Sequence, residues 1–178
     1  LKTFEAHGVY GMAVISAVVA QNTFHVTGMQ AVPADLVGRQ IDCVFEDIRP
    51  DAVKIGMLSS PECMKAVADK LRQYRPANVV IDPVMFAKNG DPLMDPESVG
   101  ALIETVLPFA DVLTPNVPEA QYLAGMEIHT PADMETAARK IGALGCKNVL
   151  VKGGKNIPGA VDVLFDGETC HRIEIEQI

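Results

Sequence analysis

The chain has 178 residues, a length typical of one domain. Its 23 acidic and 15 basic side chains give a formal net charge of -8, which argues against nucleic acid or an anionic membrane as the main partner. The longest apolar run, residues 12–20, is too short for a membrane-spanning helix, which needs roughly 20 residues.

Four cysteines are spread along the chain without a CxxC pair. Cys43 and Cys63 fall in segments of helical periodicity, so we expect both to be buried free thiols. Free thiols fit a reducing, cytoplasmic location better than a disulfide-linked fold. The four histidines show no metal-ligand spacing, and a zinc site is therefore not predicted.

Apolar strands and amphipathic helices alternate along the sequence. Inner strands are expected near residues 13–19, 52–56, 79–82, 111–114 and 148–151. Helices are expected at residues 1–4, around 37–48, and after Ser60, Asp95, Asn116 and Thr130. Residues 161–165 and 171–175 read as two further strands around an Asp166-Gly167 turn. Uniformly apolar strands that alternate with helices predict an α/β fold, with a mostly parallel central sheet and helices on both faces.

The residues that follow the predicted strands are mostly polar or glycine. They are Gln21 after the first strand, Met57 after the second, Asp82 after the third, Asn116 and Glu119 after the fourth, and Lys152-Gly153-Gly154 after the fifth. Ligands of open α/β sheets bind beyond the carboxyl ends of the strands. This edge is therefore the predicted site.

Several of these residues also have a purely structural interpretation. Gln21 can simply end a strand, or its carboxamide can read the edge of a heterocycle. Met57 is a common type of core residue, and Asp82 before Pro83 can shape a turn.

The segment after the fourth strand has the spacing of a helix capping box, which the spacing alone favours over a ligand site. The same helix start can attract phosphate near Asn116, and the Glu119 carboxylate can hold Mg²⁺ through water. Lys152-Gly153-Gly154 can be a plain turn, or it can place a lysine cation beside exposed backbone N–H groups that would suit a polyphosphate. The segment lacks the GxxxxGK[ST] pattern of a Walker A loop.

Five blocks of sequence together resemble the hydroxymethylpyrimidine/phosphomethylpyrimidine kinases of thiamine biosynthesis. The blocks are residues 10–12 with 20–22, residues 51–58 (DAVKIGML), residues 82–85 with 88–91 (DPVM and KNGD), residues 114–119 (TPNVPE) and residues 151–154 (VKGG). They occur in the family's order across essentially the whole chain.

The resemblance implies a ribokinase-like three-layer sandwich, formed as a single domain by residues 1–178. It also implies ATP- and Mg²⁺-dependent phosphorylation of 4-amino-5-hydroxymethyl-2-methylpyrimidine and then of its monophosphate, commonly by a homodimer. The residue roles that follow are substrate binding by Gln21, Met57 and Val84, nucleotide binding by Asn116 and Lys152, and metal binding by Asp82 and Glu119.

Two features of the family are not found in residues 1–178. The family begins with a strand and a Gly/Ser-rich turn that would precede Leu1, and a Gly-Thr-Gly-Cys-type anion hole would follow Ile178. We therefore expect a domain truncated at both ends, with its catalytic residue beyond Ile178 and no activity in residues 1–178 alone. A pyridoxal or pyridoxine kinase and a catalytically silent pyrimidine-binding domain are the alternatives.

Overall fold

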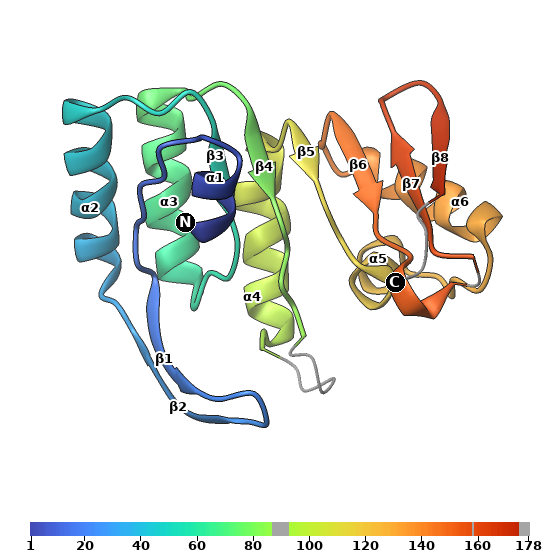
Figure 1. Cartoon of the computed structure of the whole chain (residues 1–178), viewed down its shortest axis with the longest axis horizontal. Helices are drawn as coiled ribbons and strands as arrows, with labels where there is room; N and C mark the ends of the chain where they lie inside the picture. Colours follow the sequence, from blue (N-terminus) through green and yellow to red (C-terminus); the bar gives the residue numbers. More distant parts are fainter. Residues whose placement is uncertain (87–92, 158, 175–178) are drawn as a thin grey trace.

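The computed structural model describes residues 1–86, 93–157 and 159–174, in which a six-stranded sheet is the central element (Figure 1). Its strands, in spatial order, are β3 (Val53–Ile55), β4 (Val79–Ile81), β5 (Val112–Leu113), β6 (Asn148–Val151), β7 (Val161–Phe165) and β8 (Cys170–Glu174). The first four strands pair in parallel, and β7 and β8 complete the sheet as an antiparallel hairpin. The mostly parallel sheet predicted from the sequence is confirmed.

Two of the described helices precede the strands of this sheet in the chain, and the others connect its successive strands. The helices are α1 (Lys2–Ala6), α2 (Ala34–Asp47), α3 (Pro61–Tyr74), α4 (Pro96–Ala101), α5 (Val117–Ala124) and α6 (Pro131–Gly142). After α4 the helix continues through a π-helical turn, Leu102–Val106, and a 3-10 turn, Leu107–Phe109. Figure 1 shows α2, α3 and α4 side by side.

The crossover helices lie on one face of the sheet. Each of β4, β5 and β6 is added beside its predecessor in the same direction, and right-handed crossovers then place α3, α4, α5 and α6 on the same side. Burial alternates accordingly, because Val79 and Ile81 are 2% and 0% exposed while Val80 between them is only half-buried. These crossover helices therefore form one helix layer, on the face of the sheet that buries Val79 and Ile81.

Local sequence signals start the helices where they were expected. Ser60 Oγ accepts the Cys63 N–H at 3.2 Å and Asp95 Oδ1 accepts the Ser98 N–H at 2.7 Å, with proline next in sequence each time. The apolar stripe of α3 is buried in a single core that extends along the chain from Val37 to Val163.

The first predicted inner strand is wrong. The structure places β1 (Ala17–Gln21) in a separate antiparallel hairpin with β2 (Val26–Ala31), outside the six-stranded sheet. A short apolar run does not distinguish a buried strand from a hairpin strand. The signal that was available is Asn22, whose side-chain oxygen accepts the N–H groups of Phe24 and His25 at 2.9 and 3.0 Å and so forms the turn.

All four cysteines are free thiols. Cys63 is buried as predicted, whereas Cys43 is exposed, because α2 lies at the edge of the helix layer and buries only Val37 and Gly38. Burial raises the pKa of the Cys146 thiol to about 11. Among the described residues, no helix combines the length and the apolar character that crossing a membrane requires.

A polar network around Asp111 fixes the amino ends of β4, β5 and β6. Its carboxylate accepts a hydrogen bond from the Val79 N–H at 2.8 Å and forms an ion pair with Lys147 at 2.5 Å. Its backbone oxygen accepts a hydrogen bond from the Asn148 side-chain amide at 2.7 Å. The hydrogen bond from Lys147, followed by that from Val79, lowers the pKa of Asp111.

We predict that Asp111→Ala lowers the free energy of unfolding by about 1–3 kcal/mol, because the Val79 N–H loses a charged partner. Urea unfolding measures the change, with Asp69→Ala as control, since Asp69 makes only exposed pairs with Lys65 and Arg72.

The native pKa of Asp111 lies below the 3.8 of a free aspartate, so its contribution is present above about pH 4 and is lost as the pH falls through the native pKa. The difference between wild type and Asp111→Ala should therefore shrink in acid. An equal effect of the two substitutions at neutral pH would contradict the assignment.

Candidate functional site

Three of the predicted site residues meet at the carboxyl edge of the parallel strands. Lys152, directly after β6, forms a parallel bridge with Asn116, and its N–H donates to the Pro115 oxygen at 2.8 Å. Its side chain reaches back across the edge, where Nζ lies 3.0 Å from Oδ2 of Asp82, directly after β4. Backbone pairing and an ion pair thus join the ends of three neighbouring strands.

Lys54 belongs to the same cluster and was missed in the sequence. Its Nζ lies 3.7 Å from the Asp82 oxygen that pairs with Lys152. Ile55 and Val151 are buried against the helix layer, so the residues next to them, Lys54 and Lys152, point to the other side of the sheet. A single lysine inside an otherwise apolar three-residue strand was the available signal.

The charge balance of this cluster is positive. Two lysines approach one carboxylate, which leaves one cation in excess within a chain of net charge -8. The side chains of Lys54 and Lys152 are 44% and 37% exposed, against 23% for Asp82. Both ammonium groups can therefore meet an anion that arrives from solvent.

Asn116 and Glu119 form the capping box that their spacing favoured. The Asn116 side chain accepts the Glu119 N–H at 3.0 Å, and Glu119 Oε2 accepts the Asn116 N–H at 2.9 Å. Glu119 is only 2% exposed, and its second oxygen, Oε1, accepts the Met85 N–H at 3.1 Å. Both of its oxygens are therefore engaged by backbone groups.

The segment that follows β4 has an unusual backbone. Val84 has φ +34°, in the left-handed region that β-branched residues rarely adopt. The neighbouring residues are held on both sides, since the Asp82 N–H donates to the Ile55 oxygen at 2.9 Å and Met85 is bound by Glu119. Strain of this kind persists where the surroundings determine the backbone, and it is frequent at ligand sites.

Met57 and Gln21 are both connected with the β1–β2 hairpin. The Met57 backbone oxygen accepts a hydrogen bond from Ser16 Oγ at 2.9 Å, at the base of the hairpin. Gln21 ends β1, pairs with Val26 next to a register shift, and is exposed. It lies five residues beyond Ser16, about 16 Å along an extended strand. Figure 1 shows that the hairpin projects beyond the carboxyl edge of the sheet.

The Gly153 backbone is set by a close approach of β7. A Cβ atom at this position would lie 2.1 Å from the Val161 oxygen, and the Gly153 N–H donates to the Asp162 side chain at 2.9 Å. Gly154 follows with φ +50°, so the plain-turn interpretation accounts for both glycines. The KNGD block, residues 88–91, lies outside the described residues.

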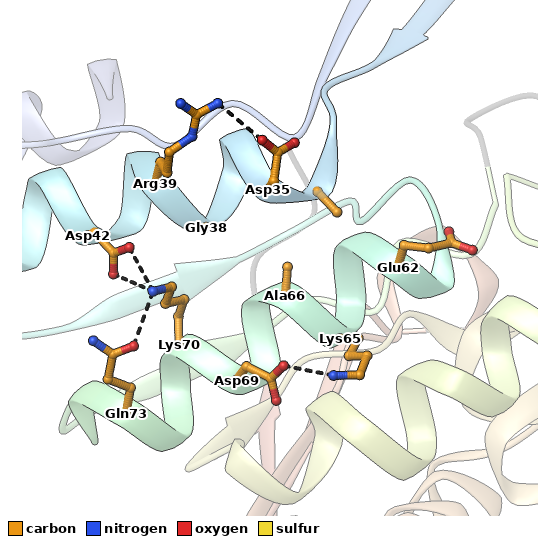
Figure 2. Close-up of a pocket in the computed structure, with 11 residues that line it drawn as sticks. Asp35, Gly38, Arg39, Asp42, Glu62, Lys65, Ala66, Asp69, Lys70 and Gln73 are labelled. Carbon is orange, nitrogen blue, oxygen red and sulfur yellow. Dashed lines mark hydrogen bonds and ion pairs between the residues drawn. The ribbon is translucent and has the colours of Figure 1, made fainter.

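A second polar surface lies away from this edge, in a groove between α2 and α3 (Figure 2). Lys70 Nζ binds Asp42 at 2.7 Å and Gln73 at 3.1 Å, while Arg39 pairs with Asp35. Tyr74 also donates to Asp42, at 2.6 Å, which raises the pKa of the tyrosine. The bonds from Lys70 and Tyr74 to Asp42 join the two helices, whereas the Arg39–Asp35 pair lies within α2, so the polar contacts of this groove have a structural explanation.

The architecture matches solved kinases. A crystal structure of phosphomethylpyrimidine kinase from Clostridium difficile 630 has a TM-score of 0.91 and 44% identity, covering 98% of this chain and 76% of that one. The ADP complex of Bacillus subtilis pyridoxal kinase has a TM-score of 0.89 and 38% identity, covering 99% and 67%. The fold is that of the ribokinase-like class of kinases.

Within that class, the chain belongs to the phosphomethylpyrimidine kinase family, whose model matches residues 1–178. The hydroxymethylpyrimidine/phosphomethylpyrimidine kinase of Rhizobium meliloti is 47% identical over 181 residues, which cover 100% of this chain and 67% of that protein. Among the curated relatives compared, the chain spans 35% to 70% of their length.

Proposed function

We propose that the complete protein transfers the γ-phosphoryl group of ATP to 4-amino-5-hydroxymethyl-2-methylpyrimidine and then to its monophosphate, in thiamine biosynthesis. The observation that carries this proposal is the family match across all 178 residues. Pyridoxal is the second candidate substrate, because the Bacillus subtilis pyridoxal kinase shares the fold at 38% identity.

Lys152 and Asn116 are proposed to face the ATP phosphates. Lys152 supplies a half-exposed cation whose place at the strand end is fixed by its bridge to Asn116. Asn116 begins α5, and a helix N-terminus favours negative charge. Phosphoryl transfer depends mainly on positioning and charge stabilisation, which are the contributions that this edge can make. The excess cation of the Lys54–Asp82–Lys152 cluster supports an anionic ligand.

Of the two carboxylates assigned to Mg²⁺, Asp82 fits that ion and Glu119 fits poorly. Mg²⁺ in kinase sites takes one or two carboxylates together with substrate phosphates. The ion pairs of Asp82 with the lysines involve Oδ2, and its side chain is 23% exposed, so Oδ1 can face a hydrated ion. Glu119 is buried, and each of its carboxylate oxygens already accepts a hydrogen bond from a backbone N–H group. Bound Mg²⁺ would neutralise charge on the phosphates.

Met57 and Val84 are proposed as apolar walls for the pyrimidine ring, and Gln21 as the hydrogen-bonding partner of its amino group. Met57 and Val84 follow the neighbouring strands β3 and β4 and are both half-buried. The hairpin that carries Gln21 is attached at Met57 through Ser16, which supports a place for it beside the same pocket.

We further propose a homodimer that uses the hairpin, and a cytoplasmic location consistent with the free thiols. Isolated two-stranded ribbons are marginally stable in water, and this one exposes 87% of Phe24 and 52% of Val26. Phe24→Ser should therefore weaken dimerisation, as measured by light scattering after gel filtration. Ile48→Ser, an equally apolar change at an exposed site outside the hairpin, is the control. An unchanged dimer in Phe24→Ser would remove the hairpin from the interface.

A coupled assay of ATP consumption on the complete protein tests the proposed function. We expect a higher kcat/KM with the hydroxymethylpyrimidine than with pyridoxal. Preference for pyridoxal would reassign the substrate, and turnover of neither would favour a silent binding domain. A polypeptide limited to residues 1–178 is expected to show no turnover, because the family's anion-hole segment is not part of it.

Two substitutions in the complete protein should separate the two halves of the site. Gln21→Ala is expected to reduce kcat/KM for the pyrimidine by the equivalent of about 1–3 kcal/mol, because the amino edge of the bound pyrimidine loses a hydrogen-bond partner. Lys152→Met is expected to raise KM for ATP more than KM for the pyrimidine. Initial rates with each substrate varied in turn measure both effects, and unchanged use of pyrimidine by Gln21→Ala would return Gln21 to a purely structural role.

A further inference from the structure

Glu119 connects two segments that are far apart in the sequence. From the first turn of α5 it reaches Asn116 in its own helix and Met85 in the segment after β4, 34 residues away. Glu119 is 2% exposed and Met85 is 1% exposed, so the bond between them is shielded from solvent. The carboxylate thus joins the start of α5 to the backbone next to Val84.

The bond to Met85 acts on the most unusual backbone position of this edge. Val84 lies at φ +34°, and a valine in that region returns to ordinary conformations unless its neighbours hold it. The Asp82 N–H is fixed on β3 and the Met85 N–H on Glu119, so these two bonds bracket Val84. Removing the second would free one side of the turn.

We propose that Glu119 is a positioning residue for the heterocycle pocket, which it shapes by holding Val84 in place through Met85, and that it is not a magnesium ligand. This inference rests on the proposed function, because the pocket formed with Val84 is part of that proposal.

A metal role for Glu119 conflicts with its burial. Each carboxylate oxygen already accepts one backbone N–H, and at 2% exposure the remaining acceptor sites have little access to a hydrated ion. Asp82, which is more exposed, is the carboxylate left for that role.

Asp133 provides a matched control. It occupies the same position in the capping box of α6, where its carboxylate accepts the N–H groups of His129 and Thr130. Asp133 therefore caps its helix as Glu119 does, and in the described part of the chain its carboxylate accepts hydrogen bonds only from residues at that helix start. A difference between the two substitutions isolates the contact with Met85.

The experiment compares Glu119→Gln and Asp133→Asn in the complete protein. Glutamine keeps the shape of the side chain but offers one acceptor to two N–H groups. The dissociation constant of the heterocycle is measured by calorimetry without nucleotide or metal. We expect it to rise about tenfold in Glu119→Gln, the equivalent of one hydrogen bond to a charged group. Asp133→Asn is expected to leave it unchanged. The Mg²⁺ concentration for half-maximal activity should be unchanged in both variants.

A wild-type measurement covers the case in which Glu119→Gln does not fold. Hydrogen exchange at the Met85 amide should be slow without metal and should stay slow when Mg²⁺, alone or with ADP, is added. Faster exchange at Met85 on adding Mg²⁺ would show that Glu119 leaves the backbone for the metal, and would overturn the proposal. A raised Mg²⁺ requirement in Glu119→Gln with unchanged heterocycle binding would overturn it equally.

The two levels of inference remain separable. Binding is measured with the hydroxymethylpyrimidine and with pyridoxal, and the variants are judged with whichever of the two the wild type binds. Failure of the wild type to use the pyrimidine contradicts the proposed function, whereas a normal wild type with an unaffected Glu119→Gln contradicts the positioning role. The exchange of Met85 does not depend on the identity of the substrate.

Discussion

The site depends on the parallel register of β3, β4, β5 and β6. Ile55 pairs with Ile81, Ile81 with Leu113, and Leu113 with Val149, so β3, β4 and β5 end at the same level and β6 continues to Val151. Ile81, Leu113 and Val149 are all 0% exposed, and burial of this row holds the strands in place. Polar residues that are 70 positions apart, such as Asp82 and Lys152, can then meet because the apolar residues before them are locked together.

Backbone contacts, more than side-chain pairs, organise the edge. The bridge between Asn116 and Lys152, the bond from Asp82 to Ile55 and the bond from Met85 to Glu119 each fix a main-chain position. The ion pairs of Asp82 with the lysines are partly exposed and therefore contribute less to stability. This division suits a ligand site, because the cations can change partner while the backbone that carries them stays in place.

Much of this architecture could be predicted from the sequence, for identifiable reasons. Four of the five expected inner strands and the helix starts at Ser60, Asp95, Asn116 and Thr130 were found because apolar runs and capping residues act locally. The capping box of Glu119 was likewise visible in its spacing. Its bond to Met85 was not, since a contact across 34 residues has no local pattern. The hairpin was missed because β1 is as apolar as an inner strand, although Val18 is 63% exposed.

The strands of the large sheet are added in the order in which they occur in the chain, from β3 to β8. Each new strand therefore pairs with the one made just before it, and no strand has to be inserted between two that already exist. Each parallel pairing still closes a loop that contains a helix, such as the one between Ile55 and Val79, but that loop is shorter than the one an inserted strand would have to close. On the ribosome, where the amino-terminal part emerges first, this sheet can grow strand by strand as the chain is synthesised.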